Sequence, residues 1–358
     1  MTNTRFDQSE LSNFAEKVLV KIGTSPETAK LAVQSLIDTS LMGIDTHGIE
    51  ALDMYVNHIQ RGGLKIQGAG LQLIEGKKEL ELWDMQNGFG LAEARRLMTH
   101  AIQRARESGI FMLTCRNSNH IGACGIYGKI AADEGLIGLI SQQTNAVFVP
   151  FGGKELRIGA SPFAFVAPLK DSFPFYFDAS MATISRGQIK KAMRNGTLLP
   201  EGVALDRNGK PTVVPAESWE GQLLPIGNHK GIGLAMVFEI LSCVLSGNRF
   251  ASEIPSIVNN PNLPAGSSIF IIVIDPKFVM PAGDFPQAMR QYIEYIESST
   301  AINPDNPPGY PGLLESKNWA DRSRNGIPIS DNGLEHLNQI AKSLGTEELK
   351  KPFESLTK

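Results

Sequence analysis

The sequence of 358 residues is poor in cysteine, with only Cys115, Cys124 and Cys243 and no CxxC spacing. This odd count, together with an N-terminus that lacks the basic and apolar regions of a signal peptide, predicts a reducing, cytoplasmic location. No stretch approaches the ~20 uninterrupted apolar residues of a bilayer span. A net charge of −3 without any block of lysines and arginines makes nucleic acid and anionic membranes unlikely partners. These absences favour a protein that binds a small molecule.

Several nucleotide and metal motifs are also missing. The dinucleotide fingerprint GxGxxG does not occur, because GFGLAE (88–93) and GIGLAM (231–236) lack the third glycine. There is no Walker A motif, no HExxH and no GxSxG. The six histidines are not spaced as metal ligands, so the sequence predicts neither a standard Rossmann domain nor a metal site.

Hydrophobic periodicity predicts an α/β protein with helical ends. Residues 1–80 have the pattern of helices, with Ser25-Pro26-Glu27 as a start signal for the second. We assign 81–283 to a sheet domain and 284–358 to a C-terminal helical part. Within the sheet domain, the pattern predicts strands at 110–115, 136–141, 163–168, 173–178 and 268–275, and helices at about 90–107, 120–133, 184–194 and 230–246. The last helix is apolar on nearly every face, which predicts a buried core helix.

Asp45-Thr46-His47-Gly48 forms a tight joint between two predicted helices. Histidine titrates near neutral pH without perturbation, and the Thr46 hydroxyl can orient the ring or bind a substrate oxygen. His47 is therefore a candidate acid/base. The alternative is that His47 merely caps the preceding helix.

Ser118 to Ala123 lies where a predicted strand passes into a predicted helix. Ligands of open α/β sheets bind beyond the carboxyl ends of strands, and a helix start offers free amides. This makes His120 and the amides of Gly122 and Ala123 candidates for the site. The alternative is a helix cap followed by a surface histidine.

Two further segments suggest a nucleotide. Gly/Pro loops at 150–153 and 159–162 come before a strand that ends in Asp178, where an acid for the adenosine ribose could lie, although turn chemistry explains most of these loops. Gly227 to Gly233 places Lys230 between glycines at a helix start, which suits a pyrophosphate. A glycine-rich helix start with a solvated lysine is the alternative.

In this order the motifs resemble the malate/L-lactate dehydrogenase family of the non-Rossmann type, which includes sulfolactate and ureidoglycolate dehydrogenases. The matching strings are HG (47–48), SNHIG (118–122), VPFGG (149–153), GASPFAF (159–165), FDASMA (177–182) with RG (186–187), LPEGVALDRNGKPT (199–212), HKGIGLAMVFEILSCVLSG (229–247), YPG (310–312) and RNGIPIS (324–330). The resemblance implies the sulfolactate-dehydrogenase-like fold, a mixed-sheet nucleotide domain without the Rossmann fingerprint and with helical parts from both termini.

The resemblance also implies an NAD(P)-dependent oxidoreductase that transfers hydride between the cofactor and a small 2-hydroxy acid/2-oxo acid pair, working as a homodimer. His47 and His120 correspond to the histidines at the substrate. The implied cofactor contacts are Thr144, Asp178, Ala179, Ser180, Lys230, Pro311 and Gly312. Asp178 favours NAD, because a carboxylate at the ribose would repel the phosphate of NADP. We expect His47 to exchange the proton and His120 to lie against the nicotinamide.

The chain departs from the family pattern at three places. Thr46 replaces a serine, Ala160-Ser161 replaces Thr-Asn, and Ala51 replaces an arginine suited to grip a carboxylate. Either another cation takes over, with Arg116, Arg157 and Arg186 as candidates, or the substrate is not a simple 2-hydroxy acid. The alternatives are reduction of a cyclic imine or a sugar-derived keto acid, and a catalytically lapsed relative that only binds nucleotide.

Overall fold

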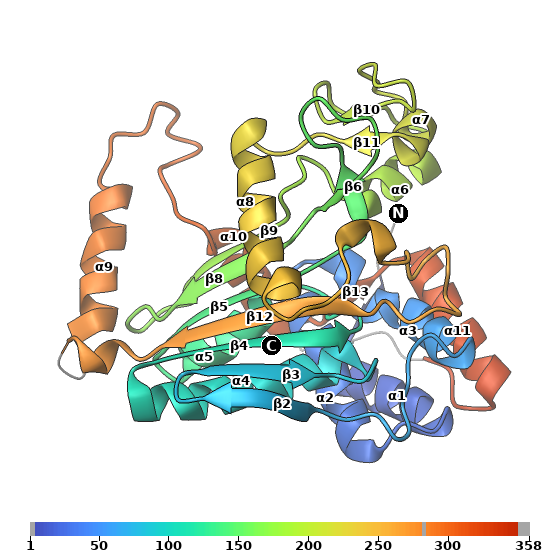
Figure 1. Ribbon diagram of the computed structural model, residues 1–358, viewed down its shortest axis with the longest axis horizontal. Helices are drawn as coiled ribbons and strands as arrows, with labels where there is room; N and C mark the ends of the chain where they lie inside the picture. The colour runs from blue at the N-terminus through green and yellow to red at the C-terminus, as the bar shows by residue number, and fades with distance from the viewer. Residues whose placement is uncertain (1–3, 281–283, 350–358) are drawn as a thin grey trace.

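The computed structural model describes residues 4–280 and 284–349 and consists of a large sheet, the helices on its faces, and a helical body built from both ends of the chain (Figure 1). The helices of the described chain are α1 (Gln8–Lys21), α2 (Pro26–Leu41), α3 (Leu52–Gln60), α4 (Gly90–Ser108), α5 (Gly125–Asp133), α6 (Arg186–Asn195), α7 (Pro215–Glu220), α8 (His229–Glu239), α9 (Asp284–Glu297), α10 (Leu313–Asn325) and α11 (Asp331–Leu344). Short turns of 3₁₀-helix are η1 (Asp45–His47), η2 (Ile49–Ala51), η4 (Ala251–Glu253) and η5 (Pro276–Phe278), and η3 (Ile240–Val244) is π-helical.

Seven strands form the main sheet in the order β2-β3-β4-β12-β5-β8-β9. Their bounds are β2 (Gln72–Lys77), β3 (Leu80–Asp84), β4 (Ile110–Ser118), β5 (Ile137–Gln142), β8 (Phe163–Ala167), β9 (Phe175–Ala179) and β12 (Ser267–Ile274). Within it β3 and β4 run parallel, and the other neighbours pair antiparallel. The sheet is therefore mixed, as predicted. The ends of β4, β5 and β9 and the starts of β8 and β12 lie on the same side of the sheet, along the line of its strand ends. The register shows this, since Ser118 pairs with Ser267 and Phe163 with Ala179.

Helices cover both faces of this sheet. α4 and α5 bury one face, and α8 with η3 crosses the other (Figure 1). Beyond α8 lies a small lobe with its own apolar cluster, formed by α6, α7 and the strands β6 (Ala146–Phe148), β7 (Ile158–Gly159), β10 (Ala204–Leu205) and β11 (Gln222–Leu223).

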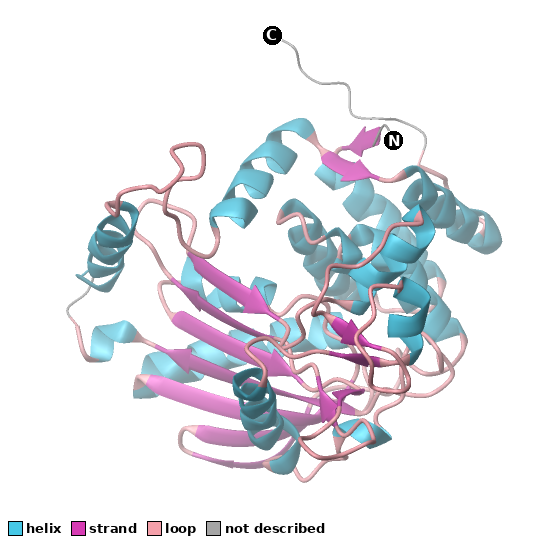
Figure 2. Cartoon of the chain, turned by 90° about the horizontal axis from the view of Figure 1, so that it is seen from above, coloured by secondary structure: helices cyan, strands magenta, loops and turns pink. Residues whose placement is uncertain are grey.

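The two ends of the chain meet in the helical body. β1 (Thr4–Phe6) pairs antiparallel with β13 (Ile327–Ile329), and residues of α1, α2, α3 and α11 share one buried cluster. Figure 2 shows the helices gathered beside this short pair of strands. The Ser25 side chain accepts from the Thr28 amide and starts α2, as its sequence predicts. Nothing in the described chain is long and apolar enough, as a helix, to cross a membrane.

The sheet begins earlier than predicted, because β2 lies inside the segment 1–80 that we assigned to helices. Every residue of β2 is exposed at the edge of the sheet, so the strand lacks the alternation that marks a half-buried strand. The helix α10 was also not predicted. Residues 301–312 form the loop between α9 and α10, and α11 follows α10.

The prediction of a fully buried helix at 230–246 is wrong for the single chain. Ile232, Ala235 and Phe238 are buried, but the opposite face of α8 and η3 is open. The apolar residues exposed by 44–54% on this face are Leu234, Met236, Val237, Ile240, Val244 and Leu245. We call this set the α8 apolar face. The sequence of this helix is apolar on nearly every face, which favours burial on all sides, but the described chain covers only one side.

Candidate active site

His47 and His120 lie against each other although 73 positions separate them in sequence. Their rings are stacked, with centroids 5.5 Å apart and planes inclined by 24°. His47 belongs to η1, in the joint between α2 and α3, and His120 belongs to the loop after β4. The Thr46 hydroxyl lies 2.9 Å from Nδ1 of His47. The two histidines and Thr46 thus form one group, as the sequence predicted.

Tight contacts hold the joint in place. The Ile49 amide donates to Oγ of Ser40 at 2.8 Å, and Arg322 on α10 forms an ion pair with Asp45. Arg322 also donates to the Ser40 carbonyl at 2.7 Å. A Cβ added at Gly48 would lie 2.3 Å from the Ser40 hydroxyl, so only glycine fits there.

His120 is held by Tyr55, which the sequence analysis did not select, and by the Gly122 amide. The hydroxyl of Tyr55 lies 2.7 Å from Nδ1 of His120, and the Gly122 amide donates to the same nitrogen at 3.4 Å. A signal for Tyr55 was present, because a buried tyrosine hydroxyl usually finds a hydrogen-bond partner.

Burial lowers the pKa of both rings. The pKa of His120 falls from 6.5 to about 3, chiefly through burial and with smaller contributions from His47 and His58. Burial also lowers the pKa of His47 from its ordinary value. His120 is consequently neutral at every pH at which the protein works, which leaves His47 as the candidate of the pair for proton exchange.

A second group of predicted residues gathers where β9 leaves the sheet. The Met181 amide donates to the Ala160 carbonyl at 2.9 Å, and the Ile226 amide donates to the Met181 carbonyl at 2.9 Å. These bonds place the 159–161 loop, the 178–181 segment and the start of α8 side by side. Lys230 is exposed at that helix start, which has no side-chain cap, and Asn228 before it has a φ of 53°.

The expected role of the Gly122 and Ala123 amides is corrected by the structure. α5 starts at Gly125, not near residue 120, because side chains of Gln142 and Tyr127 bind the Ile121 amide and carbonyl and keep Ile121 outside the helix. The Gly122 amide is used by His120, and Ala123 is buried. Neither is a free amide at a helix start.

At the actual start of α5, the backbone amide is not free, because it is bound by Asp178. One of its carboxylate oxygens accepts from the Gly125 amide at 2.7 Å. Burial raises the pKa of Asp178 from 3.8 to about 6, against the opposing effect of that hydrogen bond. Asp178 thus caps α5 from a neighbouring strand, a contact that the sequence did not predict.

The remaining cofactor candidates line the same region. Thr144 accepts from the Ala160 amide at 2.8 Å, and Ser180 accepts from the Ala182 amide. The Ala179 backbone pairs with Phe163. Pro311 accepts from the Tyr176 amide at 3.0 Å, and Gly312, with a φ of 111°, comes immediately before α10.

The three arginines considered as replacements for the family arginine differ in their surroundings. Arg116 forms an ion pair with Asp84, and Arg157 is exposed. Arg186 donates to the carbonyls of Ser218 and Trp219, and its guanidinium lies 5.2 Å from the centroid of the Trp219 ring. The next residue, Gly187, approaches Thr46 so closely that an added Cβ would lie 3.0 Å from the threonine methyl. Arg186 is therefore on a segment that touches Thr46, the neighbour of His47.

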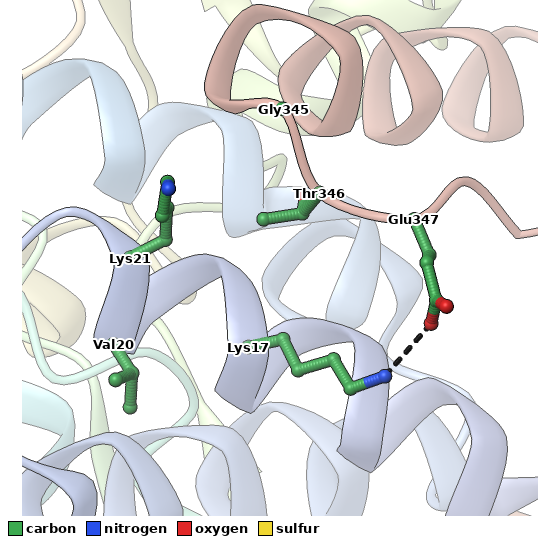
Figure 3. A pocket seen from close by; sticks show the side chains of 6 residues that line it. All are labelled: Lys17, Val20, Lys21, Gly345, Thr346 and Glu347. Carbon is green, nitrogen blue, oxygen red and sulfur yellow. Dashed lines mark hydrogen bonds and ion pairs between the residues drawn. The ribbon is translucent and has the colours of Figure 1, made fainter.

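Figure 3 shows a cavity of about 370 Å³ away from these residues, between α1 and the segment after α11. It is lined by Lys17, Val20, Lys21, Gly345, Thr346 and Glu347. None of them is a predicted site residue. Over the described ranges, no cluster of three or more His, Cys, Asp or Glu side chains could hold a metal ion.

Comparison with known proteins identifies the fold family. The sequence profile described as malate/L-lactate dehydrogenase matches residues 6–338. The chain belongs to this family. A malate dehydrogenase of Pyrococcus horikoshii is 34% identical over 96% of this chain and 97% of its own length. An L-sulfolactate dehydrogenase of Methanocaldococcus jannaschii is 30% identical over 92% of this chain and 94% of its own length.

A solved structure agrees with the sequence relatives. The sulfolactate dehydrogenase structure from Methanocaldococcus jannaschii matches with a TM-score of 0.87 at 29% identity, over 96% of this chain and 98% of that one. The predictions of the family, of its fold and of an oxidoreductase are thus confirmed.

The Asp178 cap makes stability depend on pH. Because the pKa of Asp178 is raised in the folded state, its contribution to stability is present at low pH and is lost as pH rises through about 6. Asp178→Asn keeps an oxygen acceptor for Gly125 without the buried charge. We expect this variant to be more stable than the parent by roughly 1–3 kcal/mol above pH 7, with no difference below pH ~4.

Denaturant unfolding between pH 4 and 8 measures this difference. The matched control is Asp171→Asn, since Asp171 is an exposed carboxylate at the other end of the same hairpin. A variant at 178 that is less stable than the parent at pH 7.5 would show that the charge stabilises the cap.

Proposed function

We propose that this dehydrogenase uses NAD and acts on a small 2-hydroxy acid/2-oxo acid pair. The observation that carries the proposal is the stacked pair of His47 and His120, one able to titrate near neutral pH and the other held neutral. Hydride transfer to a carbonyl needs one group that supplies a proton and a second that binds the oxygen. The names of the relatives, malate and sulfolactate dehydrogenases, support the same substrate class.

A nicotinamide cofactor held by the residues near Lys230 and the end of β9 would, when bound, supply or accept the hydride. His47 gives its proton to the substrate oxygen in reduction and removes it in oxidation. Thr46 fixes the His47 ring through Nδ1. His120 donates a hydrogen bond to the same oxygen and holds it in line for the transfer.

The residues at the end of β9 and the start of α8 fit a dinucleotide. Lys230 and the uncapped amides of α8 suit a pyrophosphate, because an anion is stabilised at a helix N-terminus. The Ser161 hydroxyl is buried without a partner among the described residues, and Ser161 has a φ of 36°. Such an orphaned hydroxyl in a strained loop suits a ligand contact. Asp178, ionised at neutral pH, favours NAD over NADP.

We further propose that Arg186 receives the substrate carboxylate. Arg116 is neutralised by Asp84, whereas in the described chain Arg186 has only carbonyl partners and an indole. Its segment touches Thr46 at Gly187. Arg186 would thus take the role of the arginine that the family carries at the position of Ala51.

The roles of the two histidines can be separated by kinetics. We expect His47→Ala to lower kcat about 10²–10⁴-fold on the best 2-oxo acid and to remove the pH dependence near neutrality. In the parent, reduction should slow as pH rises through a midpoint below 6.5, because burial lowers the pKa of His47. His120→Ala should mainly raise KM.

The measurement is oxidation of NADH and NADPH with a panel of 2-oxo acids and cyclic imines at pH 5–9. Near-normal turnover of both variants would refute the assignment of the pair, and an inactive His120→Ala beside an active His47→Ala would reverse the roles. Turnover confined to cyclic imines would show that the substrate is an imine and not a 2-oxo acid. A preference for NADPH would overturn the assignment to NAD. NADH binding without turnover of any compound would support a lapsed relative.

Lys230 provides a separate test of the cofactor site. Lys230→Ala should weaken NADH binding at least tenfold, because one charge-assisted contact is worth about 1.5–3 kcal/mol. Fluorescence titration with NADH measures the dissociation constant. Lys30→Ala, at an exposed lysine of α2, is the control and should change nothing. Unchanged affinity in Lys230→Ala would place the pyrophosphate elsewhere.

We also propose that the chain works as a homodimer in the cytoplasm. The α8 apolar face supports the dimer, since a second copy would cover residues that the single chain leaves open. Three free, buried cysteines fit a reducing compartment.

A charge on this face should break the dimer. We expect Val237→Asp to give a monomer in sedimentation velocity while the parent sediments as a dimer, because the partner would bury an unpaired carboxylate. Val20→Asp is the control, since Val20 is a 41% exposed valine on α1. A parent that is monomeric at micromolar concentration would refute this proposal.

A further inference from the structure

Tyr55 contacts the histidine pair with its hydroxyl and with its ring. It lies on α3 with no exposed surface, and its ring centroid is 5.9 Å from that of His120 and 5.7 Å from that of Phe89. The hydroxyl is 2.7 Å from Nδ1 of His120. Within the described part of the chain, this nitrogen is the one hydrogen-bond partner of the Tyr55 hydroxyl.

The contacts at Nδ1 determine where His120 carries its proton. The Gly122 amide can only donate, and it donates to Nδ1, so this nitrogen acts as an acceptor. A neutral imidazole with an acceptor at Nδ1 carries its hydrogen on Nε2. The Tyr55 hydroxyl must then donate as well. Burial raises the pKa of Tyr55 well above its ordinary value, so the phenol keeps its proton throughout the working range.

We propose that Tyr55 is a positioning residue that locks His120 in the tautomer with hydrogen on Nε2. This rests on the proposed function. His120 thereby presents a permanent hydrogen-bond donor to the substrate oxygen, and His47 alone exchanges a proton. Without the phenol only the longer contact of the Gly122 amide, at 3.4 Å, still opposes the other tautomer, so that tautomer becomes accessible. Its Nε2 would present a lone pair to an oxygen that builds up negative charge, which is repulsive.

The charged and titratable groups around His120 agree with this division. His47 on η1 and His58 on α3 both oppose a positive charge on the ring. His58 is engaged with the Leu263 carbonyl at 3.1 Å. Tyr127 on α5 lies close enough to Tyr55 to oppose ionisation of the phenol. Among the described residues, the groups that shift the pKa of His120 include no acid, so none of them favours the imidazolium.

A purely structural role would be the simpler explanation of a buried tyrosine, and the variants separate the two. Tyr55→Phe removes the hydroxyl and keeps the ring in the apolar cluster. Tyr127→Phe is the matched control, because Tyr127 is equally buried and donates to the Ile121 carbonyl beside the same loop without touching His120. Both variants lose one buried hydroxyl, so a structural role predicts similar effects from both.

The direct readout is the ¹⁵N NMR spectrum of the histidine rings, which distinguishes a protonated from an unprotonated ring nitrogen. We expect His120 of the parent protein to be neutral with hydrogen on Nε2, and Tyr55→Phe to populate the other tautomer while Tyr127→Phe does not. Hydrogen on Nδ1 in the parent protein would overturn the proposal even if Tyr55→Phe failed to fold. An unchanged His120 spectrum in a folded Tyr55→Phe would overturn it too.

Kinetics supply the second readout. Tyr55→Phe should raise KM for the best 2-oxo acid about as much as His120→Ala does, with the pH midpoint of His47 unchanged. The double variant should be no worse than His120→Ala alone, because both changes remove one function. Additive effects would show that Tyr55 acts apart from His120. If no substrate is turned over, the proposed function fails while the NMR result still decides the tautomer.

Discussion

The contact between the η1–η2 joint and the loop after β4 is the constraint on which the site depends. Asn119 fixes that loop, since its amide group donates to the Asn87 carbonyl at 2.7 Å and its oxygen accepts from the Ala265 amide at 3.0 Å. A Cβ at Gly90 would lie 2.5 Å from the His120 carbonyl. The start of α4 can therefore approach the loop only with glycine. This close packing places His120 against the η1–η2 joint, which belongs to the helical body.

The same packing shifts the pKa values of the titratable groups at the site. Removing water from a histidine disfavours its charged form. Both histidines are partly buried, and the pKa of His120 falls to about 3, with His47 and His58 adding to the effect of burial. Burial also lowers the pKa of His47. Asp178 shows the opposite direction for the same reason, because burial favours the neutral acid. The acid/base behaviour of the site thus follows from burial and from the contact between the two histidines.

The sequence predicted the parts of the site that rest on local signals. His47 and His120 were found because each lies at a junction between elements, where a polar side chain is free to serve a ligand. Tyr55 was missed because its spacing in α3 is that of an apolar residue, and only the folded chain brings its hydroxyl to His120. The predicted start of α5 was too early, because side-chain hydrogen bonds from Gln142 and Tyr127 hold Ile121 outside the helix, and local sequence signals do not reveal such bonds. The open face of α8 could not be predicted, since hydrophobic pattern does not say which molecule covers it.

The site also depends on contacts that connect the helical body, the sheet and the small lobe. Thr46 of the helical body touches Gly187 at the start of α6, and α6 belongs to the small lobe. The Ser180–Ala182 turn leads from the sheet into that lobe and is bonded to the start of α8 through Met181. A substrate between His47 and the end of β9 would therefore meet groups from the helical body, the sheet and the lobe at once. Asp45 on η1 already neutralises Arg322, so this arginine is not free to bind a substrate carboxylate, and Arg186 of the lobe, with its carbonyl partners, is the cation that fits this role.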